Sequence, residues 1–182
     1  MRTLPLIAAL TLIFAAHPGK AQMPAGPTAA STKSLPAGIL NREQAAAILP
    51  ATVFFAGQTA TIQGRNSGGI KLPDGKLILF GVVDTAGYSS AIQQKYQAYL
   101  ITEVPIALSD RRLPPGSYGF GFVDNNQMVV MDVGGNEVLR AATTRDAALG
   151  RPTPLQVLPD SPPGRFRLYL GRSYVPFGPA AK

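Results

Sequence analysis

The sequence of 182 residues predicts an all-β protein, an antiparallel β-sandwich or open barrel with one short N-terminal helix. Short segments of alternating apolar and polar residues recur along the chain, as in half-buried strands. The 19 Gly and 17 Pro residues break the chain into these segments, which favours turns over long helices. We therefore expect residues 39–182 to form a single β-sandwich domain.

The first 21 residues predict an export signal that is removed from the mature chain. Arg2 supplies a positive charge, and residues 4–16 form an apolar run that is too short to span a bilayer. Gly19 and Ala21 are the small residues that a signal cleavage site requires. A membrane anchor is the alternative, but the short run and its polar flank argue against it. We expect an exported protein, periplasmic or extracellular, without a transmembrane segment in the mature chain.

The mature chain then begins with a spacer and a helix. Residues 22–38 are rich in Ala, Pro, Ser and Thr and predict a disordered spacer. The helix is expected over residues 41–49, because Asn41 can cap its start, Gln44 completes a capping box and Pro50 follows its end. A helix of about two turns is stable only when it packs on a domain.

Alternating segments follow. Residues 52–55 and 59–63 predict two strands. Asp74-Gly75 is a strong signal for a hairpin turn, and residues 77–83 are nearly all apolar. Such a run predicts a central strand that is covered on both faces.

Residues 87–94 fit either a turn or a short helix, and aromatic and branched residues from 96 to 108 predict one long strand. Pro105 would place the end of that strand at a sheet edge or a bulge. Residues 110–112 then predict a turn.

The most regular stretch is Leu113-Pro-Pro-Gly-Ser-Tyr-Gly-Phe-Gly-Phe-Val123. Its aromatic residues (118, 120 and 122) fall on one face of a strand, and Gly119 and Gly121 fall on the other. Together with residues 128–133 and 137–143, it predicts a three-stranded meander. Further strands are expected at 155–158, 165–170 and 173–177.

This stretch resembles the "LPAGTY" start of a strand in exported bacterial β-sandwich proteins of the domain-of-unknown-function type. The resemblance covers residues 113–123 and extends weakly through "MVVMDVGGNEVL". It implies a sandwich fold and an exported protein, and it carries no catalytic residue to this chain.

Composition excludes several kinds of catalysis. The chain has no Cys, and His17, its only His, lies in the expected signal. The mature chain therefore lacks thiolate sites, disulfides, imidazole–zinc sites and Ser-His-Asp triads. We expect no cofactor, no metal and no catalytic residues.

The charge favours weak attraction to acidic polymers. The formal net charge is +7, and it falls to +5 when Arg2 and Lys20 leave with the signal. The excess is spread along the chain, which would give salt-sensitive attraction to acidic glycans. Nucleic acid is not an expected partner, because no basic helix or recognition motif is present.

Gly119 and Gly121 form the first candidate site. Their glycine face could be a ligand groove. Alternatively, a bulky residue such as Ile48 or Leu49 of the N-terminal helix packs into it.

Three tyrosines, Tyr88, Tyr96 and Tyr99, form the second candidate site together with neighbouring glutamines. Aromatic faces stack on sugars, and amides hydrogen-bond sugar hydroxyls. The alternative is that the tyrosines are core or edge residues.

A third candidate is the C-terminal strand, on which Arg165, Arg167 and Tyr169 share one face. Guanidinium groups pair well with carboxylate, sulfate or phosphate, so this face could bind anions. The alternative is a solvated outer face that discourages aggregation.

Acidic residues offer no clear site. Asp84 and Glu103 could form a catalytic pair only if they lie about 5–10 Å apart, and no spacing rule selects them. Asp124 and Asp132 lack the loop of a calcium site.

The leading functional hypothesis is a non-enzymatic binding or accessory module of the cell envelope, whose partner is an envelope glycan or another envelope protein. The alternatives are a glycan hydrolase with a carboxylate pair and an assembly protein that pairs through a sheet edge.

Overall fold

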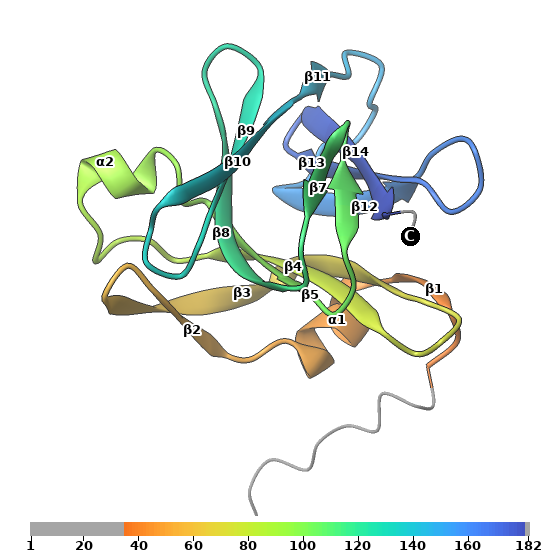
Figure 1. Cartoon of the computed structure of the whole chain (residues 1–182), viewed down its shortest axis with the longest axis horizontal. Coiled ribbons are helices and arrows are strands. Elements are labelled where there is room, and N and C mark those ends of the chain that lie inside the picture. The colour runs from red at the N-terminus through yellow and green to blue at the C-terminus, as the bar shows by residue number, and fades with distance from the viewer. Residues whose placement is uncertain (1–34, 181–182) are drawn as a thin grey trace, which may run out of the picture.

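Two antiparallel sheets pack face to face in the computed structural model, which describes residues 35–180 (Figure 1). The expected export signal, residues 1–21, and residues 22–34 of the expected spacer lie outside this range. The arrangement confirms the predicted all-β, sandwich-like fold.

The first sheet contains eight strands. In spatial order they are β1 (Gly38–Leu40), β3 (Gln58–Lys71), β4 (Leu77–Val83), β5 (Ala98–Thr102), β8 (Gly116–Val123), β9 (Gln127–Met131) and β10 (Glu137–Ala142), and β2 (Thr52–Phe55) pairs with β3. Strands β8 to β10 form the expected meander. Its first turn contains Asn125 and Asn126 at positive φ (63° and 55°), a conformation that Asn tolerates well.

The second sheet contains six strands. In spatial order they are β12 (Leu155–Pro159), β13 (Phe166–Leu170), β14 (Ser173–Pro179), β6 (Ile106–Leu108) and β7 (Arg111–Leu113), and β11 (Thr144–Arg145) pairs with β14.

The chain passes from the first sheet to the second between β5 and β6, where the sequence predicted one continuous strand. The Thr102 hydroxyl donates to the Val104 carbonyl at 2.7 Å and closes a tight turn. Pro105 follows and has no N–H with which to continue the β5 ladder. The predicted long strand is therefore two strands in different sheets, and part of the turn predicted at 110–112 is strand β7.

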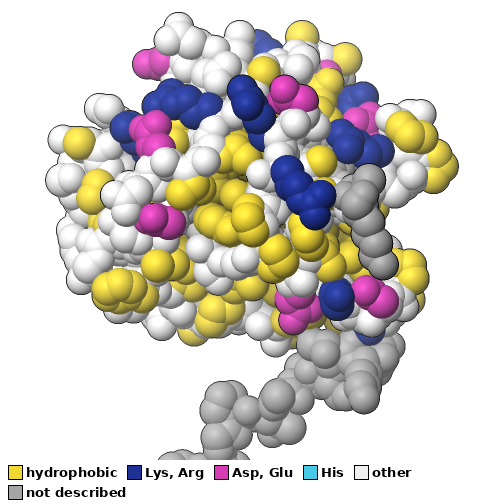
Figure 2. All heavy atoms as spheres, viewed as in Figure 1, with side chains coloured by type: hydrophobic (Ala, Val, Ile, Leu, Met, Phe, Trp, Pro, Cys, Tyr) yellow, Lys and Arg dark blue, Asp and Glu magenta, His cyan; other side chains and the backbone are white. Residues whose placement is uncertain are grey.

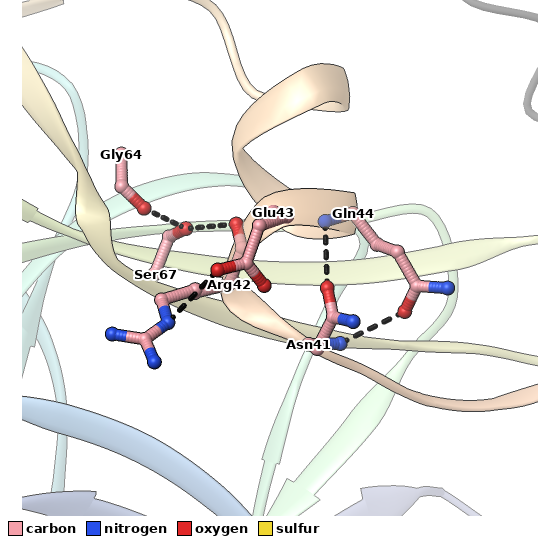
Figure 3. A network of polar contacts seen from close by, with 6 residues as sticks. All are labelled: Asn41, Arg42, Glu43, Gln44, Gly64 and Ser67. Carbon is pink, nitrogen blue, oxygen red and sulfur yellow. Dashed lines mark hydrogen bonds and ion pairs between the residues drawn. The ribbon is translucent and has the colours of Figure 1, made fainter.

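Two short helices accompany the sheets. Helix α1 (Arg42–Ile48) has the predicted capping box (Figure 3). The backbone N–H of Gln44 donates to Asn41 Oδ1 at 2.8 Å, and the backbone N–H of Asn41 donates to Gln44 Oε1 at 3.0 Å. The Ser67 hydroxyl on β3 lies 3.2 Å from the Arg42 carbonyl and 2.6 Å from the Gly64 carbonyl. This contact ties α1 to β3. Helix α2 (Ser90–Gln93) occupies the segment that fitted a turn or a short helix.

The first sheet is buried on both faces. Between the sheets, Ile78, Phe80 and Phe120 pack with Leu168 and Phe177 of the second sheet. On the opposite face, a second core is covered by α1, β2 and the segment containing α2. Strand β4 contributes to both cores, as its apolar sequence predicted.

Residues at the end of the expected spacer lie on the domain. Leu35 packs against the second core, and its carbonyl accepts a hydrogen bond from Lys71 Nζ at 2.6 Å. Gly38 pairs with Lys71 in the first sheet. The folded part of the chain thus begins before residue 39.

Neither helix in the described range has the length and apolar character needed to cross a bilayer.

Candidate functional site

The three candidate tyrosines lie in the second core. Tyr88, Tyr96 and Tyr99 are 6%, 0% and 4% exposed. The Tyr88 hydroxyl donates to the Phe55 carbonyl at 3.0 Å, and the Tyr96 ring stacks on Phe55 with centroids 3.9 Å apart. A sugar cannot stack on buried rings, so these tyrosines are core residues, the alternative that the sequence left open.

Tyr96 is unusual within this cluster. Its hydroxyl is buried and has no hydrogen-bond partner among the described residues. Burial, with smaller contributions from Tyr88 and Tyr99, raises the pKa of Tyr96. The phenol is therefore neutral at physiological pH and contributes an unsatisfied polar atom to the core.

The glycine face of β8 is also filled. A Cβ at Gly119 would overlap the Phe55 ring, and a Cβ at Gly121 would overlap the Lys95 carbonyl. The residue that occupies the strip is thus Phe55 of β2. Leu49 of the N-terminal segment packs over Gly81 instead, 3.3 Å from where a Cβ would lie. The strip leaves no ligand groove.

The carboxylates considered as a catalytic pair lie at opposite ends of β4. Glu103 Oε2 accepts a hydrogen bond from the Leu77 amide at 2.8 Å, where β4 begins. Asp84 follows the end of β4 and accepts from the Ala86 amide at 3.1 Å. Seven residues of strand span roughly 20 Å, well beyond the separation that glycoside hydrolysis uses.

Asp132 serves its own turn. Its Oδ1 accepts hydrogen bonds from the amides of Gly134 at 2.9 Å and Asn136 at 3.0 Å. Hydrogen bonds from the side chain and from the backbone N–H of Asn136 lower the pKa of Asp132. Within residues 35–180, no group of three His, Cys, Asp or Glu side chains is placed to hold a metal ion.

The outer face of the second sheet is the remaining candidate. Ala107 of β6 lies opposite Gly178 of β14 and Arg112 of β7, and directly paired residues share a face. Arg165 lies beside Gly178, with its Cδ 3.4 Å from where a Cβ on Gly178 would be. A row of two arginines separated by two small residues therefore crosses four strands.

A second row contains Arg167. It pairs with Leu158 of β12 on one side and Pro176 of β14 on the other. Leu168, between Arg167 and Tyr169, is buried between the sheets, so Arg167 faces outward. We call Arg112, Arg165 and Arg167, with the small residues Ala107 and Gly178, the arginine face.

The spacing of the arginine face suits an extended ligand. Neighbouring strands lie about 4.8 Å apart, so the Cα atoms of Arg165 and Arg112 are separated by roughly 14 Å across three strand spacings. Arg165 directly precedes β13 and lies two residues from Arg167, roughly 7 Å. The Cα atoms of the three arginines thus form a triangle on this face.

Arg167 is held in place by its neighbours. Its guanidinium bonds Asp160 Oδ1 through Nε at 3.0 Å and Nη2 at 2.9 Å, and it lies 4.7 Å from the centre of the Tyr174 ring. Hydrogen bonds with Tyr169 and with Asp160 raise the pKa of Arg167. Burial opposes ionisation of Asp160, but hydrogen bonds from the Ser161 amide and from Arg167 outweigh it and lower its pKa.

Tyr169, which the sequence places on the same face as Arg165 and Arg167, is not available to a ligand. It is 1% exposed, and its hydroxyl donates to Asp146 Oδ2 at 2.9 Å. Arg172 holds the loop beyond Asp146 by donating to the Leu149 carbonyl at 2.7 Å. Tyr169 therefore lies beside Arg167 on the same face and holds the loop at Asp146.

Charge is distributed unevenly between the two halves of the sandwich. The segments that build the second sheet, residues 106–113 and 143–180, contain three Asp and seven Arg, a formal excess of four positive charges. The other described segments contain six Lys or Arg and seven Asp or Glu. The seven arginines are Arg111, Arg112, Arg145, Arg151, Arg165, Arg167 and Arg172.

Sequence reasoning missed Arg112, because residues 110–112 were assigned to a turn. The adjacent arginines Arg111 and Arg112 were a visible signal. Their relation to Arg165 depends on the pairing of β6 with β14, which joins segments about 70 residues apart.

Comparison of the chain with models of protein families, with curated proteins and with solved structures finds no match.

Gly119→Val should lower the melting temperature markedly, because the new side chain would overlap the Phe55 ring. Overpacking a core typically costs about 1–3 kcal/mol. Gly150→Val is the matched control, since a Cβ there meets nothing within 4 Å. Equal melting temperatures for the two variants in a calorimetric scan would contradict this packing.

Tyr96→Phe should raise the free energy of unfolding by about 1 kcal/mol, because it removes a buried hydroxyl that lacks a partner. Tyr88→Phe should lower it, because that hydroxyl bonds the Phe55 carbonyl. Urea unfolding measures both changes. If Tyr96→Phe instead lowers the free energy of unfolding, as Tyr88→Phe should, the Tyr96 hydroxyl is satisfied in solution.

The Asp160 contact should make stability depend on pH. Because its folded pKa is lowered, its contribution is present above the ordinary Asp value of 3.8 and is lost as the pH falls through the folded pKa. Asp160→Asn should therefore lower the free energy of unfolding at pH 7, by less than about 1 kcal/mol for this partly exposed pair. It should also weaken the decline on acidification. Urea unfolding from pH 7 to below the ordinary Asp pKa tests this, and parallel curves would refute it.

Proposed function

We propose that this protein is an exported, non-catalytic binding module of the cell envelope and that the arginine face binds an anionic envelope glycan. The observation that carries the proposal is the placement of Arg112, Arg165 and Arg167 on one outward face of a rigid sheet. Guanidinium groups bond carboxylate and sulfate in a forked geometry, and they keep their charge at any physiological pH.

The width of the arginine face supports a polymer rather than a small ion. Arg165 and Arg112 lie three strand spacings apart, so a chain that crosses the strands can place anionic groups on both arginines, while the Gly164 carbonyl and the Arg165 stem fill the space over Gly178. Arg167 is fixed by Asp160 and Tyr174 and loses little conformational entropy on binding.

The positive excess on this half of the sandwich adds long-range attraction. Four formal positive charges gather on the segments of the second sheet, whereas the rest of the described chain is close to neutral. Such a field raises the association rate of an anionic polymer and is screened by salt.

The placement of the acids supports binding over hydrolysis. Asp84 and Glu103 lie at opposite ends of β4. Asp160 and Asp146 are engaged with Arg167 and Tyr169.

The test compares polygalacturonate and dextran sulfate with neutral dextran, using calorimetric titration of the purified chain at low and physiological salt. The anionic polymers should bind, neutral dextran should not, and salt should weaken binding. Arg167→Gln should reduce affinity about tenfold, the value of one strong charge-assisted contact. Asp160→Asn should increase affinity, because Asn keeps an oxygen acceptor that holds Arg167 but removes the negative charge that competes with the ligand.

Arg145→Gln is the matched control. Arg145 pairs with Ser173, one residue from the outward-facing pair Thr144 and Tyr174, and so lies on the opposite face of the sheet. Equal losses for Arg145→Gln and Arg167→Gln would show only non-specific attraction, and binding of neutral dextran would exclude an anion site.

A further inference from the structure

A groove lies where the two sheets approach each other at β3 and β12. It has a volume of about 400 Å³. Three segments line it: residues 39–42 at the start of α1, residues 65–68 of β3, and residues 153–158 around β12. We call it the corner groove.

The local sequence of β3 creates this groove. The β3–β4 pairing shifts register between Ile62 and Ser67, so the residues between them are not paired with β4. Strand β12 lies beside Gly68, where a Cβ would be in ordinary van der Waals contact with Val157 Cγ2, at 3.5 Å. The Ser67 hydroxyl bonds the Arg42 carbonyl and fixes the third wall, the start of α1 (Figure 3).

The corner groove is positively charged. Arg42 and Arg65 line it, and no Asp or Glu is among its lining residues. Arg42 bonds Glu43 through Nε at 3.0 Å, and its terminal nitrogens point away from the helix (Figure 3). Within residues 35–180, the side chain of Arg65 makes no hydrogen bond or ion pair. The groove therefore offers guanidinium donors to an anion.

Backbone and amide donors line the same groove. The Asp160 amide bonds the Arg165 carbonyl, and the Gly171 amide bonds the Pro154 carbonyl. In an antiparallel ladder the bonding direction alternates, so Leu155 and Val157 direct their N–H groups away from β13. Gln156 is also a lining residue, but its Nε2 is buried and its side chain shares the outer face with its pairing partner Tyr169, so the backbone N–H groups are the donors that β12 offers.

The rest of the lining is apolar. Leu40, Leu155 and Val157 are buried core residues, so the apolar surface that a ligand can reach is mainly that of Ile39 and Leu158. A ligand that fits both parts carries one anionic group and a short apolar body.

We propose that the corner groove binds a carboxylate with a short aliphatic body, with Arg65 holding the carboxylate and Ile39 and Leu158 contacting the aliphatic part. Two sources share this chemistry: a free aliphatic acid and the C-terminus of an extended polypeptide. The site uses other charged residues than the arginine face, because Arg42 and Arg65 line the groove and Arg112, Arg165 and Arg167 do not. It therefore stands whether or not the protein binds glycans.

The experiment titrates the purified chain with four probes and follows the Arg65 Nε–H and the Val157 backbone N–H by NMR. Hexanoate and hexanol form one pair; acetyl-Val-Leu with a free carboxylate and its C-terminal amide form the other. Each carboxylate that matches the natural ligand should shift both signals and bind at least about tenfold more tightly than its neutral partner. Binding of hexanoate alone would identify the natural ligand as a free aliphatic acid. Binding of the peptide alone would identify it as a polypeptide C-terminus.

Three variants complete the design. Arg65→Gln should reduce carboxylate affinity about tenfold, and Arg65→Lys should recover part of it, since Lys keeps the charge but loses the forked geometry. Arg145→Gln should bind as the parent does. Arg65 is exposed, so unchanged melting temperatures will confirm that these variants fold.

The proposal is overturned if neither carboxylate binds up to about 10 mM, beyond the weak end of specific binding. It is also overturned if the neutral partners bind equally, or if Arg65→Gln binds as the parent does. Arg167→Gln, which tests the glycan proposal, should leave hexanoate and peptide binding unchanged, so the two proposals can fail independently.

Discussion

Burial of β4 on both faces organises the rest of the structure. Ile78 and Phe80 of β4 point into the core between the sheets, whereas Leu77, Leu79 and Val83 point into the second core. Exposing either set would cost roughly 25 cal/mol for each Å² of apolar surface. A sandwich of two sheets covers only one of these faces. Helix α1, strand β2 and the segment containing α2 therefore form a third layer on the other.

This third layer consumes the aromatic side chains that might otherwise bind a ligand. Phe55 lies between the Tyr96 ring and the backbone of Gly119, and Tyr88 bonds the Phe55 carbonyl. The absence of a side chain at Gly119 brings the aromatic layer close to the sheet. The rings thus stabilise the fold, and the polar chemistry of the surface is left mainly to charged residues. Figure 2 shows one such surface, on which Lys and Arg side chains lie above a central hydrophobic area.

The second sheet differs from the first because its outer face lacks a comparable apolar layer. Arginine suits such a face, since its guanidinium stays hydrated while its stem covers neighbouring apolar groups. Asp160 and Tyr174 hold Arg167 in one orientation, and Tyr169, two residues along the strand, bonds Asp146. This arrangement is a preorganised cationic surface on a rigid scaffold. Preorganisation reduces the entropy lost when an anion binds.

The sequence alone determined the local features: strand alternation, the Asp74-Gly75 turn, the capping box of Asn41 and the outward direction of Arg165 and Arg167. Each depends on backbone geometry and on residues close together in the chain. Only the tertiary structure decided that the strand predicted over 96–108 divides between two sheets and that the tyrosines are core residues. It also decided that Arg112 lies on the same face of the second sheet as Arg165. Alternation shows that two faces differ, but it does not show which distant segment covers each face. Long-range pairing makes that choice.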